Sequence, residues 1–151
     1  MVLTHLGRHA DSQAAVLRRE TIARYQSIDA RDTGIEAGRN ASADTVAADL
    51  RRAIDGLDAA YQDADWTGFG ERLPGIDQEP FAIYPFQRWR EVEVHHADLG
   101  VGYTHDDWPE SLGERWLPDV LASLADRSDR RRLLAWALGR VPAAPPLGAW
   151  R

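Results

Sequence analysis

The sequence predicts an all-helical domain of the bundle type, and two observations carry this prediction. Apolar residues recur at the 3.6-residue spacing of a single helix face in four or five separate stretches, and no stretch shows the convincing alternation of apolar and polar residues that a half-buried strand needs. In helical bundles, ligand sites are built from side chains on facing helices. We therefore expect any binding site to combine residues from distant parts of the chain.

The first part of the chain contains three predicted helices. Residues 2–19 follow helical spacing without a preceding capping residue, so we expect the chain to lack the natural beginning of its bundle. Residues 20–41 indicate a long connection with a short helix at 29–37. Ser42 is a good N-cap for the clearest amphipathic helix, which we expect to end near Asp63. One face of that helix carries Val46, Leu50, Ala53, Ile54, Leu57, Ala60 and Tyr61.

A loop and a further helix follow. The glycine and proline content of residues 65–85 predicts a loop with an extended piece around 69–73. Pro85 suits the first turn of the next helix, which includes residues 88–99 and is closed by Gly100. This helix concentrates carboxylates, imidazoles and arginines in three turns.

Two further helices are expected near the end of the chain. Residues 108–126 predict a helix that Pro118 bends, and residues 128–138 predict another that Ser128 caps and Gly139 ends. A proline-rich tail follows.

Composition bounds the class of protein. The 151 residues are 44% hydrophobic and 28% charged, which is typical of a soluble globular domain. A net charge of -6 argues against nucleic-acid binding. We expect a cytoplasmic protein, because no apolar run approaches a bilayer span and no secretory signal is evident. All 18 basic residues are arginine, a compositional resemblance to high-GC actinobacterial proteins.

Glu91 and His95 are the first candidates for a metal site. Residues four apart lie on the same helix face, so both side chains can reach one ion. The same spacing also fits an ordinary surface pair. Val92 and Leu99, which we expect to be buried, favour a position at the edge of the buried face. Because the chain has no cysteine, a metal must be held by histidine and carboxylate side chains.

A third ligand is available in the first helix. His5 and His9 lie one turn apart there, and helical geometry alone does not choose between them. Either histidine with Glu91 and His95 would give the two-histidine, one-carboxylate set of catalytic zinc, with one coordination position open. We expect His96 to be a packed or hydrogen-bonded core histidine and His105 to face solvent.

Several sequence segments together resemble one known family. They are VLTHLGRHADS, ASADTVAADLRRA, RWREVEVHHADLGVGY and Asp107-Trp108-Pro109. Over roughly the first 110 residues the chain resembles the N-terminal domain of the mycothiol-dependent maleylpyruvate isomerase family, in the DinB-like superfamily. The resemblance implies a four-helix-bundle type of fold and a divalent metal, usually zinc, held by His5, Glu91 and His95.

The resemblance also implies a reaction and a thiol cosubstrate. Mycothiol at the open metal position would be deprotonated, and its thiolate would add to the cis double bond of maleylpyruvate, allow rotation, and leave to give the trans isomer. Addition without elimination would be S-transfer to another small electrophile. Arg88 is the candidate catalytic residue, and Arg88 and Arg90 are candidates for binding the cosubstrate and substrate carboxylates. Arg88 could equally cover the bundle surface with its stem.

Two departures from the family shape further expectations. The helix that normally precedes the His-Leu segment is not in this chain, and residues 133–150 resemble only the end of the family's second domain. We therefore expect residues 1–126 to form the metal-binding domain and 127–151 a remnant, and we expect a homodimer to cover the apolar surface left open. The alternatives are a non-catalytic helical metal-binding or dimerisation module, and a DinB-like metal-dependent hydrolase.

Overall fold

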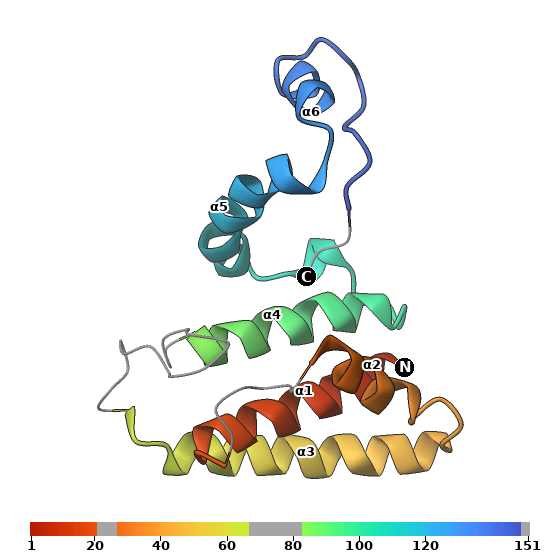
Figure 1. Cartoon of the computed structure of the whole chain (residues 1–151), viewed down its shortest axis with the longest axis vertical. Helices are drawn as coiled ribbons and strands as arrows, with labels where there is room; N and C mark the ends of the chain where they lie inside the picture. Colours follow the sequence, from red (N-terminus) through yellow and green to blue (C-terminus); the bar gives the residue numbers. More distant parts are fainter. Residues whose placement is uncertain (21–26, 67–82, 149–151) are drawn as a thin grey trace. The chain divides into compact units, whose positions relative to one another are not determined.

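The computed structural model describes residues 1–20, 27–66 and 83–148 (Figure 1). Within these ranges every regular element is a helix, as predicted. The extended piece expected at 69–73 lies outside the described residues. The helices are α1 (Val2–Leu17), α2 (Ile28–Glu36), α3 (Ala43–Asp63), α4 (Ile83–Asp98), the 3-10 helix η2 (His105–Asp107), α5 (Glu110–Arg127) and α6 (Arg130–Ala137).

The chain divides into two compact units, Met1–Asp106 and Asp107–Arg151. The first contains α1 to α4 and every candidate metal ligand, and the second contains α5 and α6. The sequence analysis expected a metal-binding domain over 1–126 and a remnant of a second domain over 127–151. The division into compact units does not test that assignment, which stays a prediction. No helix that the structure describes is both long and apolar enough to cross a membrane.

Helix α1 is the centre of the first unit and lies between α3 and α4 (Figure 1). It runs parallel to α3, because Asp11 pairs with Arg52 and the Arg18 side chain donates to the Gly56 carbonyl further along both helices. Alanines at the α1–α3 contact let the two helices approach closely, and the core built around them also takes in one residue of α4. Its members are Ala10, Ala14, Val16, Leu17, Ala53, Leu57, Ala60 and Tyr84.

A buried polar connection links all three helices. The Gln13 side chain of α1 is fully buried; its amide nitrogen donates to the Tyr84 carbonyl of α4 at 3.2 Å. Its amide oxygen accepts from the Tyr61 hydroxyl of α3 at 2.9 Å. Burial raises the pKa of Tyr61 to about 12, so this hydroxyl keeps the proton that it donates. Gln13 therefore fixes α1 against both neighbours.

The helix caps agree with the sequence at one helix and differ at another. The Ser42 hydroxyl accepts from the Thr45 amide at the start of α3, as predicted. The prediction that Ser128 caps α6 was wrong. Asp129 is the N-cap, because its carboxylate accepts from two amides, those of Arg131 and Arg132, whereas the Ser128 hydroxyl donates back to the Leu124 carbonyl of α5.

The Gln13 connection gives a prediction for stability. Replacing Gln13 with alanine leaves the Tyr61 hydroxyl and the Tyr84 carbonyl without their buried partner, so we expect a loss of about 2–4 kcal/mol in the free energy of unfolding. Urea unfolding followed by circular dichroism measures this loss. Gln62→Ala, at an exposed position of α3, is the matched control and should change stability by less than about 0.5 kcal/mol. Equal effects of the two substitutions would contradict the role of Gln13.

Candidate metal centre

The antiparallel contact of α1 with α4 sets His5 opposite Glu91. From His5 to Gln13 is eight residues of α1, and from Glu91 back to Tyr84 is seven residues of α4, so the two contacts are about equally spaced along the two helices. The spacing of four residues then brings His95 to the same place as Glu91. The site thus follows from one helix register and one helical turn.

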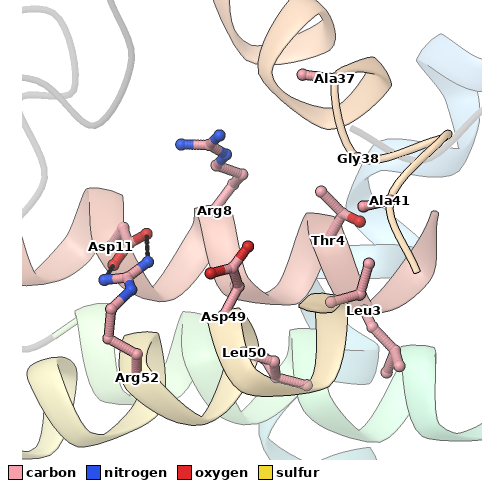
Figure 2. A pocket seen from close by; sticks show the side chains of 12 residues that line it. Leu3, Thr4, Arg8, Asp11, Ala37, Gly38, Ala41, Asp49, Leu50 and Arg52 are labelled. Carbon is pink, nitrogen blue, oxygen red and sulfur yellow. Dashed lines mark hydrogen bonds and ion pairs between the residues drawn. The ribbon is translucent and has the colours of Figure 1, made fainter. Parts of the chain in front are cut away.

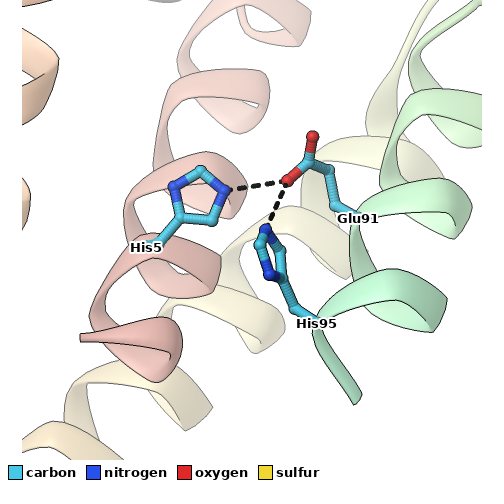
Figure 3. Close-up of side chains that lie close together, drawn as sticks. All are labelled: His5, Glu91 and His95. Atoms are coloured by element: carbon cyan, nitrogen blue, oxygen red, sulfur yellow. Dashed lines mark hydrogen bonds and ion pairs between the residues drawn. The ribbon is translucent and has the colours of Figure 1, made fainter. Parts of the chain in front are cut away.

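The three side chains converge on one point between α1 and α4 (Figure 3). His5 Nε2 lies 2.8 Å from Glu91 Oε2, and His95 Nε2 lies 3.4 Å from the same oxygen. The two imidazole rings meet edge to face with their centroids 4.7 Å apart. Exposed fractions of 15% for the side chains of His5 and Glu91 and 21% for His95 place the group at the rim of the core.

This arrangement fits a divalent cation. One ligand atom from each residue lies within 4.8 Å of the other two. Around a tetrahedral zinc ion with bonds of about 2.0–2.1 Å, neighbouring ligand atoms are about 3.3 Å apart, and the two imidazole nitrogens here lie 2.8 and 3.4 Å from the Glu91 oxygen. Two imidazoles and one carboxylate are the donor set of catalytic zinc and leave one position open. Among the described residues no other group of histidine and carboxylate side chains has this geometry.

Asp98 contacts the ring nitrogen of His95 that does not face Glu91. The sequence analysis did not identify this residue. Its Oδ2 lies 2.7 Å from His95 Nδ1, one turn along α4. When Nδ1 carries the proton and donates to Asp98, the Nε2 lone pair is left to face the site. The signal that could have found it is the three-residue spacing between His95 and Asp98.

The electrostatics of the site favour a charged carboxylate. Burial acts to raise the pKa of Glu91, but hydrogen bonds from His5 and His95, together with the charges of His9 and His5, outweigh it and hold that pKa well below its usual range. The pKa of His95 is raised, first by its hydrogen bond to Glu91, against burial and with help from Asp98. The site therefore stabilises positive charge beside an ionised Glu91.

The arginine candidates lie nearby but have structural contacts. Arg88 donates from Nη1 to the Leu6 carbonyl at 2.9 Å, which joins α4 to α1 one residue from His5. The Arg90 guanidinium lies 5.3 Å from the centre of the Phe86 ring, within cation–π range. Their expected roles in binding cosubstrate and substrate carboxylates stay predictions.

The remaining histidines are separated from the convergent group. His9 is buried one turn along α1, with its ring centre 6.3 Å from that of His5. His105 faces solvent beside Asp106, as expected. The expectation that His96 is a core residue was wrong: it is exposed and stacks on Tyr103 at 3.9 Å, on the outer side of the turn after α4.

The reasoning that placed Glu91 near the core was also partly wrong. Val92 and Leu99, expected to be buried, are 39% and 38% exposed. The buried residues of α4 lie in its first turn, at Tyr84 and Phe86, and Glu91 gains its burial from α1. A helix that packs against one neighbour buries a narrower stripe than a central helix does.

The carboxylate of Glu93 holds the end of α4 in place. Glu93 accepts from Trp89 Nε1 at 2.9 Å and from the Tyr103 hydroxyl. Gly100 and Gly102 adopt positive φ angles of 65° and 96°, which lets the chain turn back so that Tyr103 reaches Glu93. These contacts fix the last two turns of the helix, where His95 and Asp98 lie.

Comparisons with known proteins agree with this architecture. A structure of mycothiol-dependent maleylpyruvate isomerase is similar with a TM-score of 0.65 and 22% identity, over 74% of this chain and 49% of that one. A mutant of that isomerase gives a TM-score of 0.67 and 21% identity over the same shares. This chain thus spans about half the length of those structures. No curated protein sequence matches it. The family described as Mycothiol maleylpyruvate isomerase N-terminal domain matches residues 1–100. The chain belongs to that family.

Proposed function

We propose that this chain binds a divalent cation, zinc by its donor set, through His5, Glu91 and His95 and uses it to activate mycothiol for isomerisation of, or S-transfer to, a small electrophile. The observation that carries the proposal is the convergence of these three ligand atoms, with Asp98 behind His95. When bound, such a cation lowers the pKa of a thiol that it contacts, so that thiolate is available at neutral pH. The chain has no cysteine, so the thiol must come from outside.

The protein's own residues have separate tasks in this proposal. His5 and His95 supply neutral nitrogen donors, and Glu91 supplies the single negative charge, which leaves the site with net positive charge for an anionic thiolate. Asp98 holds the tautomer of His95. The contact of Arg88 with the Leu6 carbonyl keeps α4 against α1 beside the site, and its guanidinium is a candidate for binding a substrate carboxylate.

The first prediction from this proposal concerns the ligand set. Purified without chelator, the protein should hold about one zinc-like ion per chain, and His5→Ala, Glu91→Ala and His95→Ala should each lose it. Uptake should fall as the pH drops, beginning above the range of an ordinary imidazole because the pKa of His95 is raised. Metal analysis by mass spectrometry gives the stoichiometry.

The matched controls for this experiment are the histidines outside the group. His96→Ala and His105→Ala should retain the ion. Loss of the ion in His9→Ala but not in His5→Ala would show that His9, and not His5, is the ligand from α1. A parent protein that takes up no ion would favour the non-catalytic helical module.

The second prediction concerns Asp98. Asp98→Ala removes the partner of His95 Nδ1, so we expect zinc affinity to fall by about 10–100-fold while the fold is unchanged. Asp98→Asn keeps an oxygen acceptor and should lose less. Competition with a fluorescent chelator measures the affinities. Asp106→Ala, at a side chain that is 86% exposed, should have no effect on zinc affinity. If it weakens binding as much as Asp98→Ala does, the effect of Asp98 comes from its negative charge and not from its hydrogen bond to His95.

Binding and turnover place different demands on the site. Turnover requires the electrophile to be held at near-attack distance, and misplacement by about 1 Å costs on the order of a hundredfold in rate. Near the three ligands, Arg88 already donates to a backbone carbonyl and Arg90 lies over Phe86. Few groups of the described residues are therefore available to hold a substrate carboxylate.

The third prediction follows from this difference. Calorimetry should detect mycothiol binding to the zinc-loaded protein, whereas isomerisation of maleylpyruvate with mycothiol should be weak or undetectable. Glu91→Ala should abolish thiol binding together with the ion. Robust turnover that Glu91→Ala abolishes would show that this chain suffices for positioning. Zinc-loaded protein that binds no thiol would contradict the proposal and favour the hydrolase, which a hydrolytic assay with activated esters and amides would test.

The fourth prediction is that the chain forms a homodimer. Both units carry large apolar side chains that are exposed, and a two-fold dimer is the commonest way to cover such surface. They include Ile54, Val101, Leu117, Leu121, Leu134 and Leu138. Light scattering should therefore give twice the chain mass of 16.9 kDa at micromolar concentration. A well-folded monomer throughout that range would contradict the prediction.

A further inference from the structure

A cleft on another face of α1 has no part in the cation site. It lies between α1, α3 and the connection that follows α2, and has a volume of about 260 Å³. Thr4, Arg8 and Asp11 line it from α1 at the spacing of one helical stripe, next to the stripe that carries His5 and His9. Its size is just below the usual range of about 300–1,000 Å³ for pockets that take drug-sized ligands, so it suits a small metabolite.

The α2–α3 connection is held close to α1 at this cleft. A Cβ atom at Gly38 would lie 2.5 Å from both Thr4 Oγ1 and Thr4 Cγ2, so only glycine allows this approach. On the other side, the Arg8 stem runs beside Gly34 of α2, where an added Cβ would lie 3.8 Å from Arg8 Nε. These contacts define the walls of the cleft and position the Arg8 guanidinium at its mouth.

The charges of the lining are balanced but not all are paired. Asp11 and Arg52 form a two-bond ion pair at 2.9 and 3.0 Å, which also raises the pKa of Arg52. Arg8 of α1 and Asp49 of α3 both line this space (Figure 2), and among the described residues neither side chain forms a hydrogen bond or an ion pair. The charge of Asp49 also acts on Arg52, but its carboxylate is left to accept a hydrogen bond, as the Arg8 guanidinium is left to donate one.

The remaining lining is apolar on the side of Leu3, Val46 and Leu50. A doubly charged anion such as phosphate would be attracted by Arg8 but repelled by the Asp49 carboxylate. A simple amine would be attracted by Asp49 but repelled by Arg8. A ligand with both charges satisfies both residues. An aliphatic group on the same ligand would cover the leucine and valine side chains.

We propose that this cleft binds a small zwitterion, an α-amino acid with an aliphatic side chain, whose carboxylate pairs with Arg8 and whose ammonium pairs with Asp49. The Thr4 hydroxyl lines the cleft and can form a further hydrogen bond to the ligand. The cleft shares no lining residue with the cation site.

Nuclear magnetic resonance titration of the ¹⁵N-labelled full chain tests this proposal with three matched probes. L-leucine carries both charges, leucinamide lacks the carboxylate, and 4-methylpentanoate lacks the amine. Leucine should shift amide signals of residues 3–11 and 37–50, and the other two probes should bind about tenfold more weakly, since each loses one charge-assisted contact. No shift with leucine, or equal binding of 4-methylpentanoate, would overturn the proposal.

Substitutions in the cleft complete the test. Arg8→Gln and Asp49→Asn are at exposed positions, so both variants should fold, and each should weaken leucine binding by about tenfold. Arg51→Gln and Asp55→Asn, exposed neighbours outside the lining, should leave it unchanged. Unaltered binding in the two cleft variants would place leucine elsewhere and refute the assignment. All four variants should keep the zinc content of the parent protein, so this result is independent of the cation site.

Discussion

The buried amide of Gln13 is the contact on which the candidate site depends. It connects α1 to the Tyr61 hydroxyl of α3 and to the Tyr84 carbonyl of α4, and so fixes how far α4 can slide along α1. A slip of one helical turn is about 5.4 Å, more than the 4.8 Å that contains the three candidate ligand atoms. A neutral hydrogen-bonded side chain in the core, together with the Arg88 contact to the Leu6 carbonyl, therefore holds His5 opposite Glu91.

Charge explains why such a group can be held at the edge of the core. A carboxylate that is mostly removed from water costs free energy unless it is paired, and Glu91 finds its partners in His5 and His95. The same two imidazoles are the nitrogen donors that a divalent cation needs, and Asp98 orients one of them. The interactions that stabilise the carboxylate thus also keep the ligands assembled for a cation.

Short-range features of the sequence predicted much of this structure, and contacts between helices account for the rest. Helical spacing placed Glu91 beside His95, and the family resemblance selected His5, which the structure brings opposite them; that they hold a cation stays a prediction. The burial of Val92 and the core position of His96 were wrongly predicted, because a helical wheel cannot tell how many neighbours a helix has or that Tyr103 folds back onto its outer face. Asp98 was missed because its role appears only once the orientation of His95 is known.

X-ray absorption at the zinc edge, on the zinc-loaded chain before and after mycothiol is added, tests the central claim most directly. We predict a first shell of nitrogen and oxygen at about 2.0–2.2 Å with the outer-shell scattering of two imidazoles, and one sulfur at about 2.3 Å after the thiol is added. A shell without imidazole scattering would contradict the assignment of His5 and His95. A spectrum that gains no sulfur would contradict the activation of mycothiol at this site.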